Sequence, residues 1–162
     1  MVGVEFSGNP EVNSFQDFLP AFEKARELGL KISIHTAEID DSKKETDAIL
    51  DFKPDRIGHG CFMRTPQIER AVELGIPIEV CPTSNLSTSE CGVYELLSAM
   101  FKFHEKGHNI IFCTDDTMLF NTNLGSEIFE ASKVLKMNAL EVRELPFFST
   151  FRLATVVGIS VN

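Results

Sequence analysis

The sequence predicts an α/β fold in which parallel strands alternate with flanking helices. Two observations predict it: short apolar runs alternate with helical patterns, and a polar residue follows each run. These polar residues lie 27, 24, 25 and 31 residues apart, about the length of one strand–helix unit. They are Gly8, His35, His59, Ser84 and Asp115. At 162 residues the chain can form one domain with a core, but it is shorter than the ~250 residues of a complete (β/α)8 barrel.

Each predicted strand is a short run rich in β-branched or aromatic residues. The first, VGVEFS, ends at the loop signal SGNP, and the second, LKISIH, ends on a histidine. The third is short, and the fourth and fifth read IPIEVC and NIIFCT. The five strands are predicted at residues 2–7, 30–35, 56–58, 76–81 and 109–114. Because ligands bind at the carboxyl ends of parallel strands, we expect the polar residues to share one rim.

Between the strands, apolar residues recur at three- and four-residue spacing, which is typical of amphipathic helices. Asn13 or Ser14 can cap the first helix and Gly29 can end it. Pro20 falls inside that helix and can kink or delay it. The predicted helices span residues 15–28, 43–52, 67–74, 93–106, 124–136 and 139–145.

Two segments fit neither pattern. LSTSECG at 86–92 is predicted to be a polar loop. The tail at 147–162 is apolar with β-branched residues and one glycine, so a helix, a strand and an unpacked segment all stay open there. The short connections leave no room for a second domain.

Composition narrows the classes of partner. The formal net charge of −9 argues against holding a nucleic-acid polymer, because such binding depends on Lys and Arg. The cysteines form no CxxC pair, and Cys61, Cys81 and Cys113 adjoin predicted strands, so we expect them to pack as small apolar residues. The sequence shows no signal peptide and no apolar run of ~18 residues, so a cytoplasmic protein without a membrane partner is expected.

His35 and Glu38 stand three residues apart at the end of a predicted buried strand. Imidazole and carboxylate are ligands of catalytic zinc, which acidifies a bound water, and a nearby Glu can transfer protons. The alternative is a structural histidine with a surface glutamate in the following loop. His59, between Gly58 and Gly60, can approach a ligand closely or can simply be a turn residue.

Asp115 and Asp116 follow the apolar run NIIFCT. Adjacent residues point to opposite sides, so one can ligate a metal while the other meets a substrate, although the pair can also be an exposed loop. Ser84 and Asn85 can bind a ligand or cap the next element. The histidines at 104 and 108 are expected to interact with a helix C-terminus.

Four motifs together resemble the metal-dependent adenosine deaminase family in order and spacing. They are HTAE at 35–38, RIGHG at 56–60, TSN at 83–85 and TDD at 114–116. The resemblance runs from residue 2 to about residue 145 and includes VGVEFSGNP and CPTSN. It is closest to the branch whose members act on N6-methyl-AMP and related nucleotides. It implies a (β/α)8 barrel, one zinc ion, and hydrolytic removal of the six-substituent of a purine nucleoside or nucleotide.

The resemblance also implies a role for each matched residue. His35 and Asp115 are implied to be zinc ligands. Glu38 is implied to protonate the purine ring nitrogen while water attacks carbon six, and His59 to orient the attacking hydroxide and share its proton. The implied substrate contacts are the Gly8 backbone and Asp116.

The family also uses two histidines in an HxH motif, and this chain has no histidine before His35. The resemblance therefore implies the C-terminal half of the barrel, as a single partial domain over 1–162 with a divergent tail at 147–162. Because catalytic zinc generally keeps three protein ligands, we expect the isolated chain to be weak or inactive. Half a barrel exposes two strand edges, so self-association or aggregation is also expected.

Two alternatives stay open. The chain can be a non-catalytic fragment or isoform that associates with a partner supplying the HxH half. A doubly wound nucleotide-binding domain fits five β-α units in length, but no GxGxxG or Walker-type loop follows the first strand. The exact substrate, adenosine or an N6-substituted nucleotide, also stays open.

Overall fold

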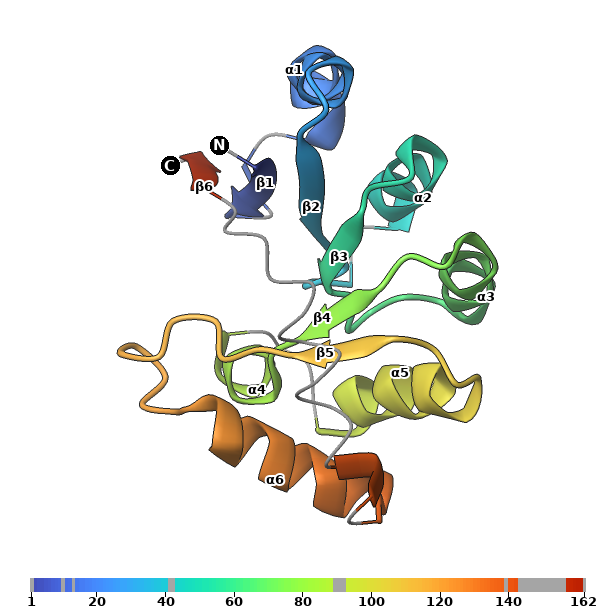
Figure 1. Cartoon of the computed structure of the whole chain (residues 1–162), viewed down its shortest axis with the longest axis vertical. Helices are drawn as coiled ribbons and strands as arrows, with labels where there is room; N and C mark the ends of the chain where they lie inside the picture. The colour runs from blue at the N-terminus through green and yellow to red at the C-terminus, as the bar shows by residue number, and fades with distance from the viewer. Residues whose placement is uncertain are drawn as a thin grey trace.

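One parallel sheet organises the computed structural model, which describes residues 2–9, 11–12, 14–40, 43–88, 93–138, 140–142 and 157–161. Its strands are β1 (Gly3–Gly8), β2 (Lys31–Thr36), β3 (Arg56–His59), β4 (Ile78–Val80), β5 (Ile110–Phe112) and β6 (Val157–Val161). Their order is β5-β4-β3-β2-β1-β6, so the first five follow chain order in a curved fan (Figure 1). This order confirms the parallel α/β fold. The first five strands run in chain order without reversal, as in a (β/α)8 barrel, whereas a doubly wound sheet reverses its order at a switch point.

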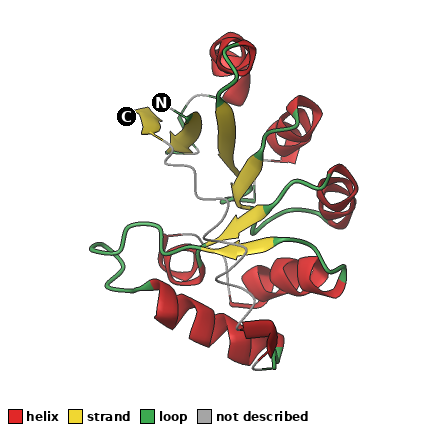
Figure 2. Ribbon diagram, viewed as in Figure 1, coloured by secondary structure: helices red, strands yellow, loops and turns green. Residues whose placement is uncertain are grey.

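Helices follow the strands around the outside of the fan, as the red coils in Figure 2 show. They are α1 (Phe15–Glu27), α2 (Lys43–Phe52), α3 (Thr65–Leu74), α4 (Pro82–Thr88), α5 (Val93–Glu105) and α6 (Leu124–Leu135). Within the described part of the chain, none of these helices has the length and apolar character needed to span a membrane.

The two faces of the sheet carry different residues because side chains alternate along each strand. The helix-facing side is apolar, and its isoleucines are at most 1% exposed: Ile32, Ile34, Ile57 and Ile78. The opposite, inner face is polar, because the register places Glu5 beside Ser33, and Ser33 beside Arg56. There the guanidinium of Arg56 pairs with Glu79 at 2.6 Å, and the Ser33 hydroxyl donates to Glu79 at 3.2 Å. The inner face is therefore a hydrogen-bonded polar layer leading toward the strand ends.

The predicted boundaries of the strands and of the first five helices agree with the structure within two residues. Helix α1 continues through Pro20, whose exposed position lets water replace the lost backbone bond. Ser14 is its N-cap, and the Ser14 N–H donates to the carboxylate of Asp17 at 2.9 Å. Asn13, the other candidate cap, lies outside the described residues. The predicted helix 139–145 is described only at 140–142, which are helical.

One expectation needs correction, and the tail adds a strand. The predicted loop 86–92 is wrong at its start, because helix α4 continues to Thr88 and the Ser87 hydroxyl donates to the Thr83 carbonyl at 2.7 Å. Residues 89–92 lie outside the described part. Strand β6, which lies within the tail, pairs with β1 in parallel from Val4–Val157 to Gly8–Val161, so the two edges of the described sheet are β5 and β6. Sequence periodicity had left the conformation of this tail open.

Candidate active site

Unusual backbone angles mark the ends of three strands. Ala37, His59 and Asp115 have φ values of 54°, 66° and 56°, although none is glycine. They lie at the carboxyl ends of β2, β3 and β5 respectively. Strained backbone of this kind concentrates at functional sites, where the surrounding structure holds it in place. The predicted site residues His59 and Asp115 are both among them.

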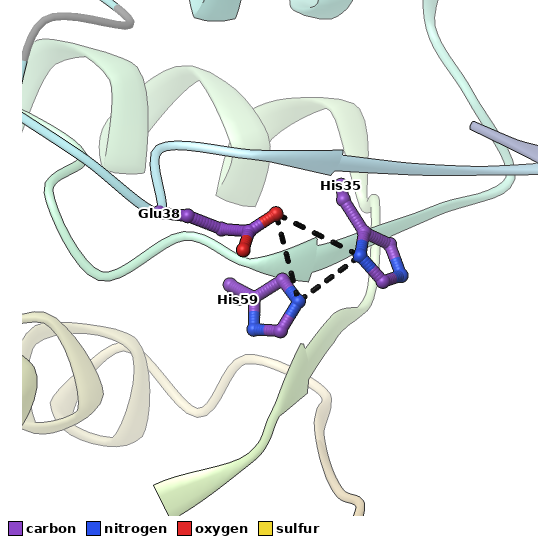
Figure 3. A group of neighbouring side chains, drawn as sticks. All are labelled: His35, Glu38 and His59. Atoms are coloured by element: carbon purple, nitrogen blue, oxygen red, sulfur yellow. Dashed lines mark hydrogen bonds and ion pairs between the residues drawn. The ribbon is translucent and has the colours of Figure 1, made fainter. Parts of the chain in front are cut away.

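The imidazole of His35 occupies space that is free because residue 58 is a glycine. Its ring lies against Gly58, its register partner on β3, where an added Cβ would come within 2.6 Å of His35 Cδ2. Its Nε2 atom lies 3.3 Å from Glu5 Oε1, and its Nδ1 atom lies 3.7 Å from Glu38 Oε1. Figure 3 shows Nδ1 turned toward Glu38 and His59. The glycine is therefore needed for the position of the imidazole.

His59 is 4% exposed and contacts both His35 and Asn85. Its Nε2 lies 3.0 Å from His35 Nδ1 and 3.8 Å from Glu38 Oε1, as drawn in Figure 3. Asn85 Nδ2 lies 2.9 Å from His59 Nδ1. The Asn85 side chain therefore orients the His59 ring at Nδ1, and the tautomer of the ring decides which of its two nitrogens carries the proton.

Burial and charge shift the pKa values of these groups in opposite directions. Burial, with the charge of His35, lowers the pKa of His59 to about 4. Burial also disfavours the charged form of His35, but its hydrogen bond and attraction to Glu5 outweigh this and raise its pKa. Burial and the nearby Asp115 raise the pKa of Glu38. A neutral imidazole beside a carboxyl with a raised pKa is suited to proton transfer.

Asp115 lies in a second group at the same rim. The Ser84 hydroxyl donates to Asp115 Oδ2 at 2.6 Å and fixes the carboxylate. Ligand atoms of His59, Cys81 and Asp115 lie within 4.8 Å of one another, as do those of His35, Glu38 and His59. His59 therefore belongs to both groups. The two predicted zinc ligands, at 35 and 115, lie in different groups but close enough for the Asp115 charge to raise the pKa of His35.

The two predicted substrate contacts also lie at strand ends. Gly8 ends β1 with a φ of 141°, a conformation that favours glycine. The carboxylate of Asp116 accepts from the backbone N–H groups of Met118 and Leu119, both at 2.9 Å, and so holds the turn after β5. Their contacts with a purine stay predictions.

Sequence reasoning missed three neighbours of the site. Glu5 could have been identified from the sequence, because a charged residue inside an apolar strand indicates a polar partner on the inner face of the sheet. For Asn85 the sequence left ligand binding and helix capping open, and the structure adds a contact of its amide with His59. Cys81 was expected only to pack; it is 6% exposed, but it also adjoins His59 and Asp115. The Cys113 thiol, followed by burial, raises the pKa of Cys81.

One minor expectation is wrong. His108 was predicted to act as a cation at a helix C-terminus. Its Nε2 instead donates to the Ile76 carbonyl at 2.7 Å, and burial lowers its pKa, so the ring is neutral near pH 7.

Comparisons with known proteins agree with this geometry. The adenosine deaminase family model matches residues 1–147. The chain belongs to the adenosine deaminase family. It is 37% identical over 141 residues to N6-mAMP deaminase of Arabidopsis thaliana, covering 87% of this chain and 39% of that protein. It is 33% identical over 155 residues to human N6-methyl-AMP deaminase, covering 92% of this chain and 43% of that protein.

Solved structures of the family share the fold. An ADAL–IMP complex superposes with a TM-score of 0.84 at 35% identity, covering 92% of this chain and 43% of that chain. The chain thus spans about two fifths of the length of the family members it matches. Its sheet and helices correspond to part of a (β/α)8 barrel, as the resemblance implied.

Proposed function

We propose that these residues form part of the active site of a hydrolytic purine deaminase. The substrate is adenosine or an adenine nucleotide such as N6-methyl-AMP. The observation that carries the proposal is the convergence of His35, Glu38 and His59 at one strand-end rim, with Asp115 beside them. The IMP bound by a family member supports it, since IMP is the 6-oxopurine that such a reaction releases from AMP or N6-methyl-AMP.

The donor set fits a zinc ion. Two imidazoles and two carboxylates at one rim are the ligand types that zinc takes, and we propose His35 and Asp115 as its ligands. When bound, zinc supplies a water acidified toward neutral pH. Because a catalytic zinc generally has three protein ligands, we propose that further ligands come from a segment beyond these 162 residues, in a longer chain or a partner.

Each residue then has one task. Glu38, whose raised pKa favours its protonated form, donates that proton to the purine ring nitrogen as water adds to carbon six. His59, neutral because its pKa is lowered, orients the water and accepts its proton. That proton passes to the leaving ammonia or amine, the hydroxyl proton at carbon six returns to Glu38, and a 6-oxopurine is released. Asp116 and the Gly8 backbone hold the purine.

A second candidate is an isoform without catalysis of its own, which associates with a partner that carries the HxH half. The donor set favours it, because only His35 and Asp115 are proposed as zinc ligands and a catalytic zinc generally has three. In either case we propose a single partial deaminase domain over 1–162 with a divergent tail at 147–162. The free thiols of Cys81 and Cys113 fit a reducing cytoplasmic location.

A complementation assay tests the proposal. The chain is incubated with zinc and N6-methyl-AMP, AMP or adenosine, alone and with an HxH-bearing N-terminal half of a family member. We expect weak or no turnover alone and 6-oxopurine formation in the complex. Fast deamination with stoichiometric zinc by the chain alone would refute the need for further ligands. A stable, zinc-loaded complex that turns over none of the three substrates would refute the deaminase proposal.

A further inference from the structure

The Cys81 thiol lies beside two other side chains that can bind a metal ion. Cys81 directly follows β4, is 6% exposed, and places its sulfur with the His59 nitrogen and an Asp115 oxygen inside a 4.8 Å group. The three residues come from the ends of β3, β4 and β5, so adjacent strands deliver one imidazole, one thiol and one carboxylate. This combination of donors differs from the imidazole–carboxylate pair at positions 35 and 115.

The backbone around these three donors is well fixed. The Asn85 N–H donates to the Cys81 carbonyl at 2.9 Å, which ties Cys81 to the first turn of α4. The Ser84 hydroxyl holds Asp115, and the Asn85 amide contacts Nδ1 of His59. Each donor therefore has a neighbour that orients it, and ordered ligands raise metal affinity.

A second sulfur stands next to the group. The Val80–Phe112 register makes Cys81 and Cys113 neighbours on adjacent strands, and the Cys113 N–H donates to the Val80 carbonyl at 2.9 Å. The Cys113 thiol lies close enough to interact with the Cys81 thiol. Cys113 is only half-buried, whereas Cys81 is covered.

The chemistry of this donor set selects a class of cation. Thiolate is a soft ligand that favours Zn²⁺ and similar thiophilic ions over Mg²⁺, Ca²⁺ or Mn²⁺, which prefer oxygen. One sulfur, one nitrogen and one carboxylate oxygen suit a tetrahedral ion with one position left for a further ligand.

We propose that Cys81, His59 and Asp115 together bind a thiophilic divalent cation in this chain. On binding, the Cys81 thiol becomes a thiolate and its proton passes to the solvent. His59 then serves as the imidazole ligand in place of His35. The inference concerns metal binding by the chain as it stands and does not require deaminase activity.

Cobalt(II) titration of the reduced, metal-free chain tests the assignment. A thiolate bound to Co²⁺ gives a near-ultraviolet charge-transfer band, which nitrogen and oxygen ligands do not give. We expect this band in the wild-type chain, its loss in Cys81→Ser, and its retention in Cys113→Ser. Cys61→Ser removes another buried cysteine near the rim and is the matched control, which should also keep the band.

Three results would overturn the inference: no Co²⁺ binding, Co²⁺ binding without the band, or a band that persists in Cys81→Ser. Binding without the band would leave the proposed deaminase centre standing, because that centre needs only nitrogen and oxygen ligands. If Cys81→Ser fails to fold, X-ray absorption on the zinc-loaded wild-type chain replaces it. A sulfur shell at about 2.3 Å is expected, and a shell of only nitrogen and oxygen near 2.0 Å would contradict the assignment.

Discussion

Gly58 lies directly against the imidazole of His35: a Cβ built at Gly58 would stand 2.6 Å from His35 Cδ2 and 3.1 Å from Nε2. The two residues are register partners on adjacent strands, so neither can move away without disturbing the sheet. The same imidazole contacts Glu5, Glu38 and His59 through its two nitrogens. The glycine of RIGHG thus determines the geometry of a histidine 23 residues earlier.

Gly58→Ala is expected to displace the His35 ring. The added methyl group overpacks a buried contact, and such substitutions cost about 1–3 kcal/mol. We expect a lower free energy of unfolding in urea, together with a changed chemical shift for the His35 ring protons.

Gly107→Ala is the matched control. Gly107 has a φ of 63° and nothing within 4 Å of its Cβ position, so alanine there is strained without touching the site. It should lose about 1 kcal/mol of stability and leave the His35 signals unchanged. Unshifted His35 signals in Gly58→Ala would contradict the contact.

Glu5→Gln is expected to lower the pKa of His35. The hydrogen bond and charge of Glu5 are the largest of the contributions that raise this pKa against burial. NMR titration of the metal-free chain measures the shift directly. Glu23→Gln, an exposed substitution on α1, is the control and should leave the pKa of His35 unchanged. A His35 pKa that is equal in Glu5→Gln and wild type would mean that Glu5 does not bind the ring.

Stability is expected to fall on acidification between about pH 6.5 and pH 4 because of His59. Its pKa is lowered from 6.5 to about 4, so the unfolded state binds the proton first and is favoured as pH falls. The stability is fully present above pH 6.5, and the loss amounts to at most about 3 kcal/mol. His35 acts in the opposite sense, because its raised pKa adds stability at low pH. The comparison is therefore between urea unfolding of wild type and of His59→Gln, with metal chelated. Equal pH slopes for the two would count against a buried, neutral His59.

Arg56 and Glu79 form an ion pair on the inner face whose side chains are only 14% and 12% exposed. Arg56→Met leaves the Glu79 carboxylate without its cation, and removing one partner of a buried pair costs about 3–5 kcal/mol. The double change Arg56→Met with Glu79→Leu should recover much of the loss. Thermal unfolding of wild type, Arg56→Met, Glu79→Leu and the double variant measures this, and an additive loss in the double variant would show that the pair is not coupled.

The sheet could be predicted from the sequence because its signals are local. Runs such as LKISIH and IPIEVC identify strands by composition, and parallel pairing then brings His35, His59 and Asp115 to one rim. The start of α4 was not predicted, because the residue types in PTSN are typical of loops and turns. Later in this helix, the hydroxyls of Ser87 and Thr88 donate to the carbonyls of Thr83 and Ser84, one helical turn earlier.

Contacts between strands could not be predicted in the same way. The roles of Glu5, Asn85 and Cys81 depend on register and on side-chain direction across the sheet, which a single sequence does not encode locally. The pairing of β6 with β1 likewise joins residues more than 150 positions apart.

The most direct test of the proposed function is the dependence of turnover on Glu38. The chain is complexed with an HxH-bearing N-terminal half and loaded with zinc, and release of methylamine from N6-methyl-AMP is measured for wild type and Glu38→Gln. We expect the glutamine variant to keep its zinc and its fold while losing at least 100-fold in kcat, because proton transfer by a positioned side chain contributes about 10²–10⁴-fold. Equal turnover by the two complexes would contradict the assignment of Glu38, and with it the deaminase site.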